Sequence, residues 1–468
     1  MADLMRVVVV GHTNTGKTSL LRTLARDAAF GEVSDRPATT RGVEAVQLVL
    51  SDGEPVMVLL DTPGLEDPGG VLDALDQMEG LGRFDAPERV RRFLALPEAG
   101  TLFEQEAKVL RQMLQAQAAI YVVDCREPVL GKYLEEITIL SYCAIPLLPV
   151  LNFIAQGENR EAEWRAQLAR LNLHAVVAFD NFVFNEVGER QLFEKLRTLL
   201  DAYTEPLNRL IEDRRQQGEW LRRAAAEILA ELLLDTAACL REVSSELRSD
   251  LLRARVLRYQ DDVRVREQNS VDALLDLFRF AHLHYNTGGL PLVNGAWGMD
   301  LFNPDALKHY GLRMGWGAAA GAATGAMIDA ATLGLTLGLG TMGGAALGAM
   351  LGGSIPMRRR LLGRLQGQYE WRVADDTLRV LALRQMGLIQ ALLHRGHAAQ
   401  GALDTPSPNA SEWIRGPLPA PIREARLKPR WSRLNADVFD AGRLDRQVAI
   451  QRLTEAIVLE LGRIPPLR

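Results

Sequence analysis

The stretch from Arg6 to Arg26, RVVVVGHTNTGKTSLLRTLAR, decides the fold of the N-terminal half. The β-branched run Arg6–Val10 predicts a buried strand, and Ser19–Arg26 predicts a helix. The eight residues between them, from Gly11 to Thr18, match the pattern GxxxxGK[ST]. A loop of this kind, between a strand and a helix, typically wraps its backbone N–H groups around a polyphosphate.

The side chains of this loop have distinct expected roles. Lys17 reaches the β and γ phosphate oxygens, and the Thr18 hydroxyl is a ligand for Mg²⁺. The other nucleotide contacts are expected from residues of the same loop and the start of the helix: Gly11, Asn14, Thr15, Gly16 and Ser19.

A second motif, Asp61-Thr62-Pro63-Gly64, closes the third predicted strand. This is the position of a carboxylate that holds Mg²⁺ through water and of a glycine whose N–H detects the γ-phosphate. We therefore assign Asp61 to the metal site and Gly64 to the nucleotide site.

A polar segment between the two motifs, RPATTR at 36–41, leads into the second strand. Such a segment brings a threonine to Mg²⁺ when a triphosphate is bound. We assign this role to Thr40, with Thr39 as the alternative. Lys17 and Thr40 are the two residues expected to act in catalysis.

Short β-branched runs alternate with helical patterns over the first two hundred residues, which predicts a parallel α/β sheet covered on both faces. The Asp52-Gly53 pair is a hairpin signal, so one edge strand should be antiparallel. A mostly parallel, six-stranded Ras-like sheet is expected, with strands at Arg6–Val10, Val43–Leu50, Val56–Asp61, Ala118–Asp124, Pro146–Asn152 and Ala175–Phe179.

The composition of the whole chain limits its class. At 468 residues the chain is long enough for two or three cores. A net charge of −5 gives no overall attraction to nucleic acid or acidic lipid. The three cysteines have neither a disulfide nor a zinc spacing, and no signal-peptide pattern precedes the first strand, so we expect a reduced, cytoplasmic setting.

Leu, Ala, Arg and Glu at helical spacing dominate from about Pro206, which predicts an all-α C-terminal half. The arginines of its first helix are interleaved with acids, so we interpret them as solvated and do not favour RNA binding, which stays open. The expected domains are 1–203 (the nucleotide-binding domain), 204–312 (helical), 313–357 (a Gly/Ala-rich apolar hairpin) and 358–468 (helical, with a Pro-rich loop at 405–429).

Glycines recur every fourth residue in two stretches, Gly317–Gly325 and Gly340–Gly352. Residues four apart share one helical face, so each stretch predicts a helix with a bare groove for close packing. We expect a helical hairpin that turns near 333–337. Two interpretations stay open: residues 315–353 enter or touch the inner face of the cell membrane, or they pack inside a soluble domain or dimer interface.

The motifs GHTNTGKTS, PATTR and DTPGL together resemble the translation-factor-related GTPases of the Era and TrmE type. More narrowly, the chain is similar to a bacterial family in which such a domain precedes an uncharacterised helical region. The resemblance implies a Ras-like fold, Mg²⁺ and GTP or GDP as ligands, and GTP hydrolysis.

The resemblance also defines two departures from Ras-like proteins. In Ras-like proteins a glutamine at the position of Leu65 orients the attacking water. Era and TrmE-like enzymes have an apolar residue at this position, as this chain does. The resemblance therefore implies slow hydrolysis, with a partner, a dimer contact or a cation completing the site. Asn152 of the base-reading motif is kept, but Phe153 and Ala155 replace its lysine and aspartate. Asp180 is an alternative carboxylate, and guanine rather than adenine is inferred from the resemblance alone.

The stretch between Gly64 and the fourth strand is longer than a minimal switch region and its helix need. It includes a basic and apolar helical pattern around Arg89–Leu94. A regulatory insertion and a surface elaboration without a role are both open.

These expectations combine into a slow GTPase switch coupled to its helical, membrane- or partner-contacting half. The alternative is a nucleotide-binding scaffold or a ribosome or RNA assembly factor with little turnover.

Overall fold

The computed structural model describes most of the chain, and the description below is confined to these residues: 4–26, 44–78, 85–154, 159–179, 186–244, 249–278, 292–293, 296–303, 335–337, 368–394, 413, 416–440 and 442–463. The chain forms two compact units. Met1–Glu219 is the body of the first, and Trp220–Leu393 with Ala402–Leu467 forms the second.

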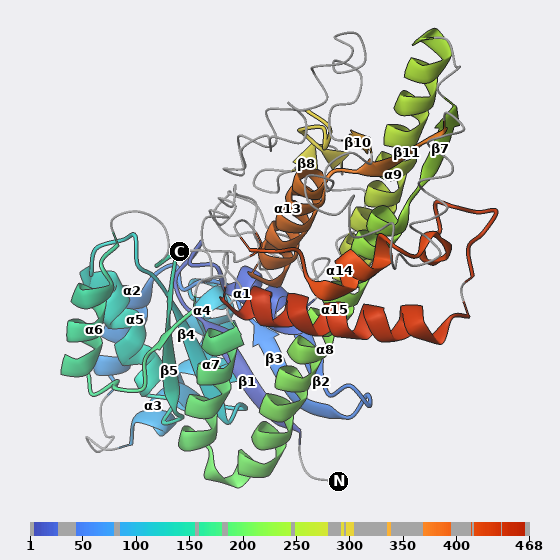
Figure 1. Ribbon diagram of the computed structural model, residues 1–468. Helices are drawn as coiled ribbons and strands as arrows, with labels where there is room; N and C mark the ends of the chain where they lie inside the picture. The colour runs from blue at the N-terminus through green and yellow to red at the C-terminus, as the bar shows by residue number, and fades with distance from the viewer. Residues whose placement is uncertain are drawn as a thin grey trace. The chain divides into compact units, whose positions relative to one another are not determined.

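A six-stranded sheet of order β2-β3-β1-β4-β5-β6 is the centre of the first unit (Figure 1). Only β2 runs antiparallel, paired with β3 across the Asp52-Gly53 turn, so the predicted mixed Ras-like sheet is confirmed. The strands are β1 (Met5–Val10), β2 (Glu44–Val49), β3 (Pro55–Asp61), β4 (Ala118–Asp124), β5 (Leu147–Asn152) and β6 (Val177–Ala178).

Alternate residues of β1 supply two separate cores because successive strand side chains point to opposite faces. Val8 and Val10 pack with helices α2 to α6, whereas Val7 and Val9 pack with α1, α7 and the start of α8. The helices are α1 (Lys17–Ala25), α2 (Pro68–Asp76), α3 (Ala86–Leu94), α4 (Glu104–Met113), α5 (Gly131–Ser141), α6 (Glu161–Arg170), α7 (Glu186–Leu199) and α8 (Thr204–Ala238).

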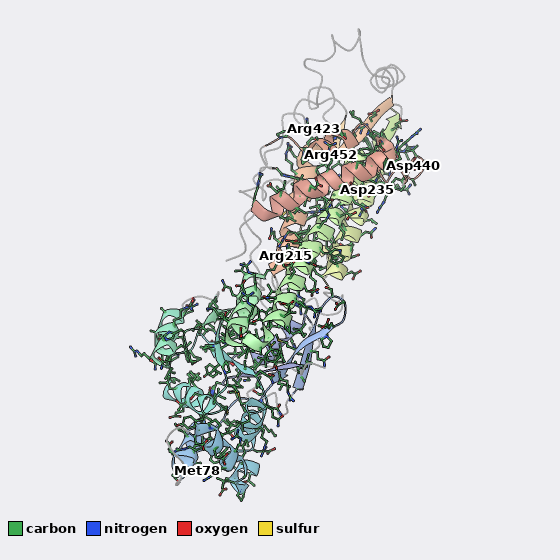
Figure 2. The ribbon with its side chains drawn as sticks, turned by 90° about the horizontal axis from the view of Figure 1, so that it is seen from below. Met78, Arg215, Asp235, Arg423, Asp440 and Arg452 are labelled. Atoms are coloured by element: carbon green, nitrogen blue, oxygen red, sulfur yellow. The ribbon has the colours of Figure 1, made fainter. Side chains whose placement is uncertain are left out.

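The helix α8 is shared between the two units: its residues up to Glu219 belong to the first and those from Trp220 to the second. Within the first unit, Leu207 and Leu210 are buried in the core under β1. On its outer side, Arg215 pairs with two acids of the same helix, as expected of a solvated face (Figure 2).

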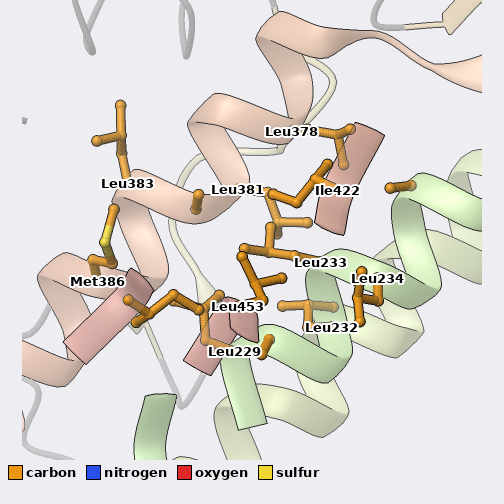
Figure 3. Packing of buried hydrophobic residues seen from close by; sticks show 14 of the residues in the cluster. Leu229, Leu232, Leu233, Leu234, Leu378, Leu381, Leu383, Met386, Ile422 and Leu453 are labelled. Carbon is orange, nitrogen blue, oxygen red and sulfur yellow. The ribbon is translucent and has the colours of Figure 1, made fainter. Parts of the chain in front are cut away.

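The second unit is mostly helical, as predicted. Leucines of α8 such as Leu229 and Leu233 pack with Leu381 and Leu453 in one continuous core (Figure 3). Its helices are the rest of α8, α9 (Ser249–Leu277), α13 (Asp375–His394), α14 (Ala420–Ala425) and α15 (Leu444–Arg463).

Short strands accompany these helices, which the all-α prediction did not include. An antiparallel sheet of order β10-β11-β7 joins β7 (Arg241–Ser244), β10 (Leu335–Leu337) and β11 (Gln368–Val373). A small hairpin pairs β8 (Leu292–Val293) with β9 (Ala296–Trp297). The alternation of polar and apolar residues in β11, with Trp371 and Val373 buried, is the physical reason that it forms a strand.

Two further details of the second unit differ from expectation. The segment predicted as a Pro-rich loop contains α14, in which Pro421 lies in the first turn, where the missing N–H costs nothing. After residue 429, where helical structure was expected, turns occupy the residues after Trp431, and the final helix begins only at Leu444.

A buried carboxylate connects the elements of the second unit. Asp235 of α8 is fully buried (Figure 2) and accepts hydrogen bonds from Arg266 of α9 at 2.8 Å and from Arg446 of α15 at 3.1 Å. The backbone N–H of Arg433 donates at 3.1 Å to Asp235 Oδ1, the oxygen that also accepts from Arg446. Three parts of the unit therefore depend on one charge.

The two arms of the predicted glycine-rich hairpin lie outside the described residues, and within 313–357 the structure describes only β10. In the described part of the chain, none of the helices has both the length and the apolar composition that crossing a bilayer requires.

Candidate functional site

The loop from Gly11 to Thr18 follows β1 and leads into α1. Gly11 has φ +140°, and a Cβ there would lie 2.6 Å from the Val122 carbonyl oxygen, so only glycine fits. Asn14 and Gly16 also have positive φ, +63° and +93°, and Gly16 is the N-cap of α1. Turns of this kind at a helix N-terminus make a concavity of N–H groups suited to phosphate. Ser19 lies in the first turn of that helix.

The Lys17 side chain lies inside this loop. Its Nζ donates to the carbonyl oxygens of Gly11 at 2.9 Å and His12 at 2.7 Å. Burial lowers the pKa of Lys17 to about 8, and the nearby carboxyls of Asp61 and Glu136 oppose this shift. The ammonium is thus held over the loop by carbonyl groups that a phosphate can replace.

Thr18 and Asp61 form the second half of the site. The Thr18 hydroxyl donates to Asp61 Oδ2 at 2.6 Å, which joins the start of α1 to the end of β3. Asp61 Oδ1 is buried and has no hydrogen-bond partner among the described residues. Burial, which dominates over the Thr18 hydrogen bond, raises the pKa of Asp61. A hydroxyl beside an unsatisfied carboxylate oxygen is a donor set that fits Mg²⁺.

The DTPG segment is packed directly on the loop. Thr62 Oγ1 donates to the Val9 carbonyl at 2.7 Å. A Cβ at Gly64 would lie 2.7 Å from the Thr13 nitrogen, so the backbone of Gly64 touches the phosphate loop as only glycine allows. Leu65 is 1% exposed and packs in the core with α2 and α5. Its side chain is therefore part of the core.

Asn152, at the end of β5, is fully buried and acts on the loop backbone. Its Nδ2 donates to the Thr15 carbonyl at 2.9 Å, and its Oδ1 accepts from Phe153 N at 2.9 Å. Phe153 has φ +58°. The guanidinium carbon of Arg126, Cζ, lies over the Phe153 ring, 3.7 Å from the ring centroid. Asp124 accepts three side-chain hydrogen bonds from Arg126, at 2.7, 3.0 and 3.3 Å.

The structure shows a network around His12 that the phosphate-loop motif does not predict. His12 Nδ1 lies 2.7 Å from Glu136 Oε1, and Lys132 Nζ lies 2.9 Å from His12 Nε2. Tyr121 donates to the other oxygen of Glu136 at 2.9 Å. The only sequence signal is that Glu136 stands in the apolar stripe of α5 with Tyr133, Ile137 and Leu140.

The structure therefore brings the phosphate loop, Asp61, Gly64 and Asn152 together at the carboxyl ends of β1, β3 and β5. Thr40 and its alternative Thr39 lie outside the described residues, as do Ala155 and Asp180.

Two family models match the chain, and the boundary between them does not coincide with the boundary between the two units. Residues 165–455, more than half of the chain, match the family model described as a domain of unknown function, DUF3482. The chain belongs to this family. Residues 6–153 match a second model, described as 50S ribosome-binding GTPase. The DUF3482 protein thus begins with a P-loop GTPase domain of the Era and TrmE type, as its motifs indicated.

Curated proteins similar to this chain include a GTPase and a GTP-binding protein. The tRNA modification GTPase MnmE of Hydrogenovibrio crunogenus is 28% identical over 258 residues, which cover 54% of this chain and 50% of MnmE. The probable GTP-binding protein EngB of Lawsonia intracellularis is 26% identical over 208 residues, covering 43% of this chain and 86% of EngB. The match to MnmE thus spans about half of that relative's length.

Solved structures to which the chain is similar include a variant of Era from Aquifex aeolicus bound to GDP and aluminium fluoride. It is 16% identical with a TM-score of 0.30, covering 58% of this chain and 90% of that chain.

Proposed function

We propose that this DUF3482 protein is a GTP-binding switch that hydrolyses GTP slowly with Mg²⁺ and couples its nucleotide state to the helical C-terminal half. The observation that carries the proposal is the arrangement at the end of β1. There the Lys17 ammonium and the hydrogen-bonded pair of Thr18 and Asp61 meet one glycine-lined loop. Bound Mg²⁺ would neutralise phosphate charge, and Thr18, Asp61 and the proposed ligand Thr40 would hold it.

Slow turnover follows from the surroundings of Leu65. A water cannot be oriented by a buried apolar side chain, so the chain's own DTPGL segment supplies no group for this step. Even a switch that has the orienting glutamine turns over at only about 10⁻⁴ s⁻¹ without an activating partner. We therefore infer that a protein partner, a second copy of the chain or a cation completes the site.

The preference for GTP rests on likeness. MnmE and EngB are named as a GTPase and a GTP-binding protein, and their matches cover 54% and 43% of this chain. Asn152, the retained member of the base motif, donates a hydrogen bond to the Thr15 carbonyl. GTP and GDP are the proposed ligands, with ATP as the competitor to test.

The proposed route of coupling is α8. Within the first unit, Gln217 of α8 accepts from Arg26 at 2.6 Å, and Asp213 accepts from Ser51 N at 3.0 Å. Arg26 directly precedes 27–43, where a switch threonine is expected, and Ser51 lies in the turn after β2. Because α8 continues into the second unit as one helix, a change at either contact would be passed along the chain.

Phosphate release tests this function. We expect purified protein with Mg²⁺ to release phosphate from GTP well above a Lys17→Ala control, and from ATP much less. Equal release from both nucleotides would contradict guanine preference. No release above the control would favour the second candidate.

The second candidate is a nucleotide-binding scaffold or a ribosome or RNA assembly factor that hardly turns over. Leu65 favours it, and so does the description of the matched family as a 50S ribosome-binding GTPase. Co-purification of ribosomal particles with the protein would support this function. Contact of residues 315–353 with a membrane, or formation of a homodimer, stays a prediction.

A further inference from the structure

The segment that follows Gly64 is fixed at three points. Leu65 is buried in the core, and Asp67 caps α2 by accepting from Gly70 N at 2.9 Å. Between these two anchors, the backbone N–H groups of Glu66 and Asp67 both donate to a single side-chain oxygen, Glu106 Oε1, at 2.7 and 2.9 Å. The main chain directly after the γ-phosphate-sensing glycine is therefore held from outside its own loop.

Glu106 comes from α4, in the additional stretch between the DTPG motif and β4. It is 2% exposed and lies among the apolar residues of its helix, with Phe103, Ala107 and Leu110 in the same core. Burying a carboxyl group is costly unless it is hydrogen-bonded, and bonds from two N–H groups to one carboxylate are among the strong ones. A hydrophobic residue at 106 would pack there at lower cost, so the position of Glu106 calls for another explanation.

The position of Gly64 gives that explanation. Gly64 lies against the Thr13 backbone, and the segment held by Glu106 begins two residues later. A shift of Glu66 would move Gly64 relative to the phosphate loop, because only Leu65 separates these two residues. Misplacement by about 1 Å at such a position can cost a hundredfold in rate.

We propose that Glu106 is a positioning residue for the γ-phosphate: it holds the backbone of Glu66 and Asp67 so that Gly64 stays against the phosphate loop. This inference rests on the proposed GTPase function. It gives the additional helix α4 a role that the sequence left open. It also predicts a selective effect, since GDP has no γ-phosphate and does not depend on Gly64.

The test compares Glu106→Ala, Glu106→Gln and wild type, with Glu104→Ala as the matched control. Glu104 is on the same helix but exposed, where it pairs with Lys108. We expect Glu106→Ala to bind a non-hydrolysable GTP analogue about tenfold more weakly and to have a reduced kcat, while its GDP affinity stays within about twofold of wild type. Glu106→Gln keeps the acceptor oxygen and should restore most of the analogue affinity. Glu104→Ala should match wild type.

A lower melting temperature with an unchanged ratio of analogue to GDP affinity would show a merely structural role and overturn the inference. If Glu106→Ala does not fold, Glu106→Asp replaces it, because the shorter side chain keeps the charge but withdraws the oxygen. The ratio of analogue affinity to GDP affinity should then be lower in Glu106→Asp than in Glu106→Gln. If both variants have the wild-type ratio, the inference is overturned. Wild-type protein that binds neither GDP nor the analogue would instead contradict the proposed function itself.

Discussion

His12 Nδ1 in the phosphate loop donates to Glu136 Oε1 in α5 at 2.7 Å. The direction follows from Lys132, whose ammonium can only donate and therefore makes Nε2 the acceptor. The carbonyl oxygen of the same histidine accepts a hydrogen bond from the Lys17 ammonium at 2.7 Å. The buried Glu136 thus fixes the residue that holds Lys17 in place before nucleotide binds.

The first prediction concerns this anchor. His12→Ala should weaken GTP and GDP binding equally, by about tenfold. Without the anchor, part of the binding free energy is needed to order the phosphate loop. The kcat for bound GTP should stay within about twofold. Titration with both nucleotides checks this, with His174→Ala as an exposed control. Wild-type affinities in His12→Ala would show that the anchor has no part in binding.

A second prediction follows from the lowered pKa of Lys17, about 8 in the folded protein against an ordinary value of 10.5. Between these values the unfolded chain holds one more proton than the folded chain, so the contribution of Lys17 to the free energy of unfolding rises with pH there and is constant below pH 8. Nucleotide binding has the opposite dependence, because phosphate needs the ammonium.

We therefore expect GDP affinity to be level from pH 7 to 8 and then to fall, approaching tenfold per pH unit, with uptake of a proton on binding. Calorimetry in buffers of different ionisation enthalpy measures both quantities. Lys17→Ala should lack the proton uptake. Binding at pH 9 without proton uptake would mean that Lys17 does not titrate in this range.

Asp61 gives a third prediction. Asp61→Asn keeps the size of the side chain but removes the negative charge that a water ligand of Mg²⁺ needs, so the apparent affinity for Mg²⁺ in the presence of GTP should fall by about tenfold or more. Binding of GDP in EDTA should change little. The Mg²⁺ concentration that half-saturates nucleotide binding is the quantity to measure. An unchanged value would remove Asp61 from the metal site.

The fourth prediction concerns the stability of the helical unit. Asp235→Asn leaves Arg266 and Arg446 without their buried counter-charge and should lower the free energy of unfolding of this unit by about 3 kcal/mol. Asp261→Asn is the control, since Asp261 is 66% exposed in its pair with Arg264 and should change the value by less than about 1 kcal/mol. Urea unfolding distinguishes them, and equal effects would contradict the central role of Asp235.

Local sequence patterns predicted most of the secondary structure of the first unit. The β-branched runs and the Asp52-Gly53 turn predicted all six strands within one or two residues at most ends, because each pattern lies within its own element. β11 was missed even though its residues alternate. A strand forms only with partners, and β7 and β10 are distant in sequence, so no local signal showed the pairing.

The same distinction applies to the site. The contacts of Lys17 are made within six residues, which is why the motif alone placed them. Glu136 and Glu106 act on residues distant in sequence, and each interrupts the apolar stripe of an amphipathic helix. A glutamate in such a stripe marks a buried carboxyl group, but its partner is visible only in the folded chain.

Calorimetric titration of nucleotide-free protein with GTP and GDP in the presence of Mg²⁺ tests the central claim most directly. We predict saturable binding of one nucleotide per chain, lost in Lys17→Ala and much weaker for ATP. Wild-type protein that binds no nucleoside triphosphate, or binds it equally well after Lys17→Ala, would contradict the account.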